Sequence, residues 1–255
     1  MPRKISTGPA LPIRVSRASV SDRIGSVIAA AFRRCSTLAY GAGRGLRNLT
    51  LVCAVVAGGA AAAQPVTVAA LGDSLTQGYG LAEGRGLVPQ LQVWLSQQGA
   101  EVTVVNAGVS GDTTAGGRAR LAWTLTPEVD ALIVNLGGND MLRGLPPEEV
   151  RANLDAILAE AGARGLPVLL VGLQAPGNWG PDYKAAFDAI FPDLAARHGA
   201  ILIDSFFAPL LNGGALDPAD MQPDGIHPSA RGVRKLVEAM GPRVLELIAR
   251  AQAAP

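Results

Sequence analysis

Short runs of apolar residues alternate with longer segments of helical period along residues 64–255. Five of these runs have the length of a β-strand, and none contains more than one polar residue. Strands that are apolar on both faces are typical of a parallel sheet buried between helices, because no face of such a strand contacts water. The predicted strands are residues 66–71, 102–105, 131–136, 168–173 and 200–203.

Three segments between or after these strands carry apolar side chains three or four residues apart, as in a helix with one buried face. Pro147 suits the first position of the first helix, Glu148 and Glu149 suit its positive N-terminal end, and Gly162 or Gly165 ends it. Gly241 and Pro242 are expected to kink the last helix. The apolar stripes are Val150, Leu154, Ile157, Leu158 and Ala161; Tyr183, Phe187, Ile190 and Leu194; and Val233, Leu236, Val237, Met240, Val244 and Ile248.

Alternating strands and helices predict an α/β fold, with a five-stranded parallel sheet in the middle of a three-layer α/β/α sandwich. Ligands in such folds bind beyond the carboxyl ends of the strands. Ser74 follows the first predicted strand, Asn106-Ala107-Gly108 follows the second, and Gly137-Gly138-Asn139-Asp140 follows the third. We therefore expect these three segments to converge at one edge of the sheet.

The first part of the chain differs from the rest in charge. Residues 1–48 hold nine basic residues and one acid, a net charge of +8, whereas residues 49–255 hold 13 basic and 20 acidic residues, a net charge of −7. Residues 49–63 are an uncharged run that follows Arg44 and Arg47 and ends in four alanines. A positive flank, a short apolar stretch and small residues are the pattern of a secretory signal peptide. We expect residues 1–63 to be a basic extension with a signal cleaved after Ala63.

Residues 64–255 then form one domain, which we expect to be periplasmic or secreted. The apolar run is shorter than the roughly 20 residues of a membrane span, so no stable insertion is expected after cleavage; an uncleaved anchor is the alternative. The pair Arg33-Arg34 is interpreted as chance rather than as a twin-arginine signal. Cys35 and Cys53 precede the domain, which leaves it without thiol chemistry. The acidic balance of the domain argues against a nucleic-acid partner.

Ser74, Asp224 and His227 together supply the groups of a serine hydrolase. A serine hydroxyl is a weak nucleophile, so it needs an imidazole to take its proton and a carboxylate to orient that imidazole. Asp224 and His227 are three residues apart, and one turn of chain can place both side chains on one side. The only other histidine, His198, precedes Gly199 at the end of a helical stretch and is expected at the surface.

Three candidate hydrogen-bond donors could stabilise the negative charge that forms on an attacked carbonyl oxygen. They are the backbone N–H groups of Ser74 and Gly108 and the side-chain amide of Asn139, and removing one such donor costs roughly 3 to 4 kcal/mol. Each motif alone also fits a turn or a helix N-cap, but their conjunction at three strand ends favours a site. Residues 72–80 lack the lysine of a phosphate-binding loop, and we expect no metal and no cofactor.

These residues resemble the four blocks of the SGNH hydrolases, also called the GDSL family, in family order. The resemblance implies a flavodoxin-like fold, with Ser74 as nucleophile, His227 as general base and then acid, and Asp224 as its orienting partner. It also implies an oxyanion hole formed by Gly108, Asn139 and the Ser74 amide. The blocks are Gly72-Asp73-Ser74-Leu75, Asn106-Ala107-Gly108, Gly137-Gly138-Asn139-Asp140 and Asp224-Gly225-Ile226-His227-Pro228.

Residues 109–114, 137–144 and 221–228 look particularly like the periplasmic branch of acyl-thioesterases, lysophospholipases and arylesterases. That likeness implies that residues 174–181 line an acyl-binding groove. It also implies a secreted serine esterase that cleaves small-molecule acyl esters and thioesters through an acyl-enzyme intermediate. A carbohydrate O-acetylesterase and a decayed acyl-binding protein are the alternatives.

Overall fold

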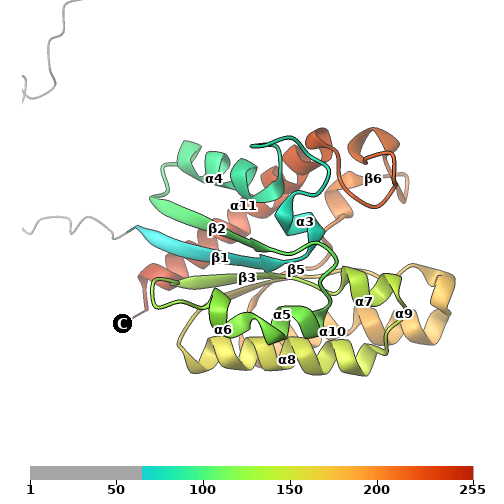
Figure 1. Ribbon diagram of the computed structural model, residues 1–255, viewed down its shortest axis with the longest axis horizontal. Helices are drawn as coiled ribbons and strands as arrows, with labels where there is room; N and C mark the ends of the chain where they lie inside the picture. Colours follow the sequence, from blue (N-terminus) through green and yellow to red (C-terminus); the bar gives the residue numbers. More distant parts are fainter. Residues whose placement is uncertain (1–64, 255) are drawn as a thin grey trace, which may run out of the picture. The chain divides into compact units, whose positions relative to one another are not determined.

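A computed structural model describes residues 65–254, which form a parallel sheet with helices on both faces (Figure 1). The strands lie in the order β2-β1-β3-β4-β5, which is the order of flavodoxin-like folds. The predicted α/β fold and each of the five predicted strands are therefore confirmed. The strands are β1 (Val66–Gly72), β2 (Val102–Gly108), β3 (Ala131–Asn135), β4 (Val168–Val171) and β5 (Ile201–Ile203).

Helices α4 and α11 cover one face of the sheet, and α5, α6, α8, α9 and α10 cover the other (Figure 1). Two short helices, α3 and α7, lie at the carboxyl ends of the strands, where ligands bind in such folds. The α-helices are α3 (Ser74–Gln77), α4 (Leu87–Gln97), α5 (Thr114–Ala119), α6 (Leu121–Thr124), α7 (Gly138–Leu142), α8 (Pro147–Ala163), α9 (Pro181–Asp188), α10 (Ile190–His198) and α11 (Ala230–Gln252).

Shorter elements complete this part of the chain. They are the 3-10 helices η1 (Gly177–Trp179), η2 (Ala208–Leu210) and η3 (Pro218–Asp220), and a hairpin of β6 (Leu211–Asn212) and β7 (Ala215–Leu216).

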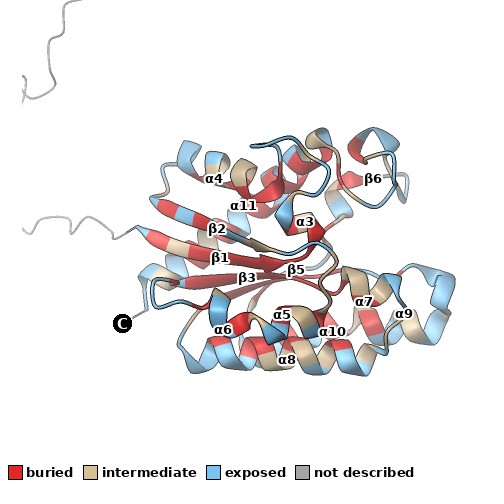
Figure 2. Cartoon of the chain, viewed as in Figure 1, coloured by how far each residue is buried: buried red, intermediate tan, exposed pale blue. Residues whose placement is uncertain are grey.

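The central strands are buried along their length, and the edge strand β2 is not (Figure 2). Val102 and Val104 of β2 face the core, whereas Thr103 and Val105 are exposed. Gln92 of α4 satisfies part of the open edge, since its side chain accepts from the Val104 N–H and donates to the Val102 carbonyl. These backbone groups of β2 are therefore not free to pair with a strand of another molecule.

The stripe from Tyr183 to Leu194 is divided between two helices rather than lying on one. Helix α9 ends at Asp188 and α10 begins at Ile190. Pro192 has no N–H to donate to the Asp188 carbonyl four residues earlier, so the α-helical ladder breaks there.

Helix α11 continues as one helix through Pro242. A Cβ at Gly241 would lie 2.5 Å from the ring of Trp94 in α4. The glycine therefore allows the two helices on this face to pack closely.

Several expectations concern residues outside 65–254 and remain predictions. They are the signal peptide, its cleavage after Ala63, the interpretation of Arg33-Arg34 as a chance pair, and the removal of Cys35 and Cys53 with the cleaved segment. Within residues 65–254, none of the helices combines the length and apolar character required to cross a bilayer.

Candidate active site

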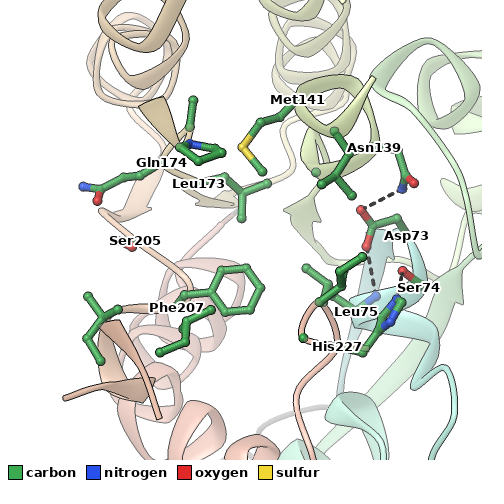
Figure 3. A pocket seen from close by; sticks show the side chains of 18 of the residues that line it. Asp73, Ser74, Leu75, Asn139, Met141, Leu173, Gln174, Ser205, Phe207 and His227 are labelled. Carbon is green, nitrogen blue, oxygen red and sulfur yellow. Dashed lines mark hydrogen bonds between the residues drawn. The ribbon is translucent and has the colours of Figure 1, made fainter. Parts of the chain in front are cut away.

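The carboxyl ends of β1, β2 and β3 lie side by side, as the sequence predicted. Gly72 at the end of β1 is in register with Gly108 of β2 and with Asn135 of β3. Helix α3 begins at Ser74 just beyond β1, and Asn139 lies in α7 beyond β3. Ser74, Asn139 and His227 lie around one pocket (Figure 3).

Ser74, His227 and Asp224 form one hydrogen-bonded chain. The Oγ of Ser74 lies 2.8 Å from Nε2 of His227, and Nδ1 of His227 lies 2.7 Å from Oδ2 of Asp224. An ionised carboxylate can only accept, so Nδ1 carries a proton and Nε2 presents its lone pair to the Ser74 hydroxyl. In this tautomer the imidazole is ready to take the serine proton.

Hydrogen bonds to Asp224 favour the ionised form of its partly exposed side chain. Its Oδ1 accepts the N–H groups of Ile226 and His227, at 2.9 and 3.0 Å. The backbone and side-chain hydrogen bonds from His227, together with that from Ile226, lower the pKa of Asp224 to about 2. The carboxylate therefore stays charged at neutral pH, where it stabilises an imidazolium beside it.

Gln222 connects the loop that carries His227 to the loop that follows Ser74. Its Nε2 donates to the carbonyl of Tyr79 at 2.8 Å and to that of Pro228 at 3.0 Å. Its N–H donates to the His227 carbonyl at 2.7 Å, and the Tyr79 ring centroid lies 4.8 Å from that of the imidazole. Sequence reasoning gave neither residue a role: Tyr79 belongs to no motif, and Gln222 lies in residues 221–228, where only Asp224 and His227 were assigned one.

Asn139 and Asp73 meet beside the nucleophile. The Asn139 amide nitrogen donates to the Asp112 carbonyl at 2.8 Å and to Oδ2 of Asp73 at 3.2 Å (Figure 3). The other oxygen of Asp73 accepts the Leu75 N–H at 2.9 Å and caps α3. Only 2% of Asp73 is exposed, and this burial raises its pKa to about 6.

Gly108 does not line the pocket, which corrects the expectation that it faces the substrate. Its N–H donates to Oδ1 of Asn106 at 3.0 Å, and a Cβ at this position would lie 2.3 Å from the backbone nitrogen of Gln77. A glycine is required here because α3 packs directly on the end of β2.

Gly111 lines the pocket instead, together with Ser74 and Asn139. It adopts a left-handed φ of 83°, which glycine tolerates without steric cost. The signal that could have identified it was a second glycine, three residues after Gly108, in the same predicted loop.

The pocket has a volume of about 720 Å³ and mostly apolar walls. Leu173, Met141 and Phe207 lie between Ser74 and His227 on one side and Gln174 and Ser205 on the other (Figure 3). Gln174, Ala175 and Pro176 belong to the loop that the family resemblance placed along an acyl groove, and all three line the pocket. The apolar lining also includes Leu75, Leu142, Leu211, Leu216 and Ile226.

His198 lies at the end of α10, as predicted, and is not among the residues that line the pocket. Its Nε2 lies 2.6 Å from Oδ1 of Asp155 in α8. This contact joins two helices and leaves His227 as the histidine next to Ser74.

Comparisons with known proteins identify relatives of this chain. Residues 70–235 match the profile of the GDSL-like Lipase/Acylhydrolase family. Esterase TesA of Pseudomonas aeruginosa is 41% identical over 189 residues, which cover 74% of this chain and 91% of that protein. Thioesterase 1/protease 1/lysophospholipase L1 of Escherichia coli K12 is 38% identical over 170 residues, covering 66% and 78%.

A solved structure is also similar. The crystal structure of AlinE4, an SGNH-hydrolase family esterase, has 42% sequence identity and a TM-score of 0.60, and the match covers 72% of this chain and 96% of that one.

Proposed function

Because this chain belongs to the GDSL-like lipase/acylhydrolase family and is a carboxylic ester hydrolase, we propose that it cleaves acyl esters and thioesters through a covalent intermediate on Ser74. The observation that carries this proposal is the hydrogen-bonded chain of Ser74, His227 and Asp224 at an apolar pocket. We further propose that it acts in the periplasm or outside the cell, on the strength of the signal-like residues 49–63.

In the first half of the reaction, the Ser74 oxygen attacks the acyl carbon while His227 takes the hydroxyl proton at Nε2. Asp224 stabilises the resulting imidazolium through Nδ1. The imidazolium then returns the proton to the departing alcohol or thiol, and the acyl group remains on Ser74. In the second half, His227 takes a proton from water, the resulting hydroxide attacks the acyl carbon, and Ser74 leaves with the proton.

Three donors are suited to the negative charge on the acyl oxygen. Ser74 and Gly111 have backbone N–H groups that form no hydrogen bond to another residue within 65–254, so both are available to substrate. The Asn139 amide is the third donor, and its longer bond, to Asp73, is the one that an acyl oxygen can replace. In this proposal Gly111 takes the role that the sequence assigned to Gly108.

The pocket walls favour an acyl chain as the group bound next to Ser74. Leu173 and Phe207 are among the apolar side chains that line the pocket. Each Å² of apolar surface that a substrate buries against them makes the binding free energy more favourable by about 25 cal/mol. An ester and a thioester present the same acyl carbon to Ser74 and differ in the leaving group, an alcohol or a thiol. This supports activity on both classes.

The test is hydrolysis of p-nitrophenyl esters from acetate to palmitate, and of the matching acyl-CoA esters, by the purified protein. Ser74→Ala should lower kcat by about 10⁴-fold or more and abolish labelling by a fluorophosphonate. Ser96→Ala is the matched control, because Ser96 is an exposed serine of α4 that does not line the pocket, and it should keep its activity.

Other results would change the assignment. Ester hydrolysis that survives in Ser74→Ala would refute the role of Ser74. A preference for acetylated polysaccharide over longer acyl chains would identify a carbohydrate O-acetylesterase. A folded wild type that neither reacts with the probe nor cleaves esters would identify a decayed binding protein.

A further inference from the structure

One guanidinium joins three backbone segments that form the candidate site. Arg120, which follows α5, donates from Nη2 to the Gly72 carbonyl at 2.8 Å and from Nη1 to the Ala107 carbonyl at 2.7 Å. Its Nε donates to Oδ2 of Asp112 at 2.6 Å. The reaction described above does not use this side chain.

Two of the three acceptors, Gly72 and Asp112, lie close in sequence to a group that the reaction needs. Gly72 ends β1 and is two residues from Ser74, and Ala107 lies at the end of β2. Asp112 directly follows Gly111, whose N–H is a proposed donor to the acyl oxygen. The guanidinium therefore fixes the separation between the turn that carries the nucleophile and the loop that carries this donor.

The connection continues to the second proposed donor. The backbone carbonyl of Asp112 accepts a hydrogen bond from the Asn139 amide at 2.8 Å. The side chains of Arg120 and Asp112 are 23% and 17% exposed, so their ion pair is partly shielded from water. Charge-assisted hydrogen bonds of this kind are roughly twice as strong as neutral ones.

We propose that Arg120 is a positioning residue for the oxyanion hole: it holds Asp112 so that the Gly111 N–H and the Asn139 amide meet the acyl oxygen in the transition state. The inference rests on the proposed function, since that oxygen gains its charge only during acyl transfer. A misplacement of about 1 Å in such a site costs about 10² in rate. Arg120 touches neither the substrate nor the reacting atoms, and so it acts through Asp112.

The geometry requires arginine rather than a positive charge alone. The three acceptors are reached by three nitrogens of one planar group. A lysine ammonium is a compact point charge on a flexible stem and cannot reproduce that fork. Arg120→Lys therefore keeps the charge and removes the geometry, which makes it the informative conservative variant.

The experiment measures kcat, KM and thermal stability on p-nitrophenyl butyrate for the wild type, Arg120→Lys and Arg120→Ala. We expect kcat to fall by about 10²-fold in both variants, while KM stays within about threefold because acyl binding to the pocket walls is unchanged. Arg118→Ala is the matched control: Arg118 lies in the neighbouring turn, is exposed and donates only to Asn153. Its kcat should equal that of the wild type.

Chemical rescue separates positioning from a merely structural role. Ethylguanidinium at millimolar concentration should raise the kcat of Arg120→Ala, whereas ethylammonium at the same ionic strength should not, because only the planar ion can bridge the vacated acceptors. If Arg120→Ala does not fold, Arg120→Lys and Asp112→Asn carry the test, and both should lose kcat with KM retained.

Unchanged kcat in Arg120→Lys and in every folded variant, with an active wild type, would overturn the inference alone. Folded variants that lose activity only through a raised KM, or without guanidinium rescue, would overturn it too. An inactive wild type would instead refute the proposed function.

Discussion

The Oγ of Ser74 lies 2.8 Å from Nε2 of His227, although 153 positions separate the two residues in the chain. Ser74 is placed by the turn from β1 into α3, and His227 by the loop that leads into α11. Gln222 bonds these two loops together through the Tyr79 carbonyl. The contact between nucleophile and base therefore depends on long-range packing, and changes in any of these segments should be visible in catalysis.

Asp224→Asn should lower kcat by about 10⁴-fold while the protein stays folded. The new amide would donate toward Nδ1 of His227, so the ring would have to carry its proton on Nε2, facing Ser74. Nε2 then could not accept the serine proton. The measurement is kcat on a p-nitrophenyl ester, with far-ultraviolet circular dichroism as the folding control. A variant that is less than tenfold slower would contradict the assigned role.

Asn139→Ala should lower kcat by about 10² to 10³, the usual effect of removing one oxyanion donor, with little change in KM. Asn139→Asp should be slower still, because it replaces the donor with a second carboxylate beside Asp73. Steady-state kinetics of both variants on one ester check the order. Equal activity in the two variants would show that this amide does not contact the acyl oxygen.

Gly108→Ala should destabilise the protein by about 1 to 3 kcal/mol, the usual cost of overpacking. The added carbon would lie 2.3 Å from the Gln77 nitrogen and 2.9 Å from the Asp73 carbonyl, so α3 would have to move. Urea denaturation measures the loss.

Gly111→Ala is the informative comparison. The added Cβ would lie 3.9 Å from the end of the Arg143 side chain, which is ordinary contact. The loss in folding stability is therefore the strain of a left-handed φ, about 1 kcal/mol or more. This variant should lose more activity than its stability loss explains. If instead Gly108→Ala lost more activity than its stability loss explains and Gly111→Ala did not, Gly108 would be the oxyanion donor.

Asp73→Asn should stabilise the folded protein at pH 8 and have little such effect near pH 4. Burial raises the pKa of Asp73 from 3.8 to about 6, so the folded state binds its proton more tightly than the unfolded state does. The free energy of unfolding therefore falls as the pH rises from about 4 to about 6, and it stays lower above that range. At pH 8 the variant should therefore have a free energy of unfolding that is higher than that of the wild type by about 3 kcal/mol at most. The altered contact with Asn139 reduces this gain.

Urea denaturation of the wild type and Asp73→Asn at pH 4, 6 and 8 measures this difference. A gap in stability that does not change with pH would contradict the raised pKa. The variant should also be less active, since Asp73 holds the Asn139 amide beside the nucleophile.

Much of the fold follows from local patterns. The run from Val66 to Leu71 is apolar at nearly every position because the strand it forms is covered by helices on both faces. The helix from Pro147 has its proline at the first helical position and its apolar stripe at residues that are buried. The break between α9 and α10 was missed, although Pro192 marks it, because the apolar period continues across it.

The glycine that ends β2 and the one three residues later show what sequence reasoning could not decide. Both Gly108 and Gly111 lie in the same predicted loop, and only the path of the folded chain decides which of them faces the pocket. Asn106 takes the N–H of Gly108, and the left-handed turn at Gly111 brings the second glycine to Ser74. The roles of Arg120 and Gln222 were not predicted for a comparable reason, since each makes one of its contacts to a residue far away in the chain, Gly72 for Arg120 and Tyr79 for Gln222.

The five strands in their order along the chain, three of the helical segments, the candidate nucleophile Ser74 and the choice of His227 could be predicted from the amino-acid sequence by itself, because burial periodicity and short motifs depend on residues close together in the chain. Only the tertiary structure decided that Ser74 and His227 touch, that the pocket is apolar, and that Gly111 rather than Gly108 lines it. These properties arise where the ends of separate strands and helices pack together, and the geometry of that packing is set by the whole domain.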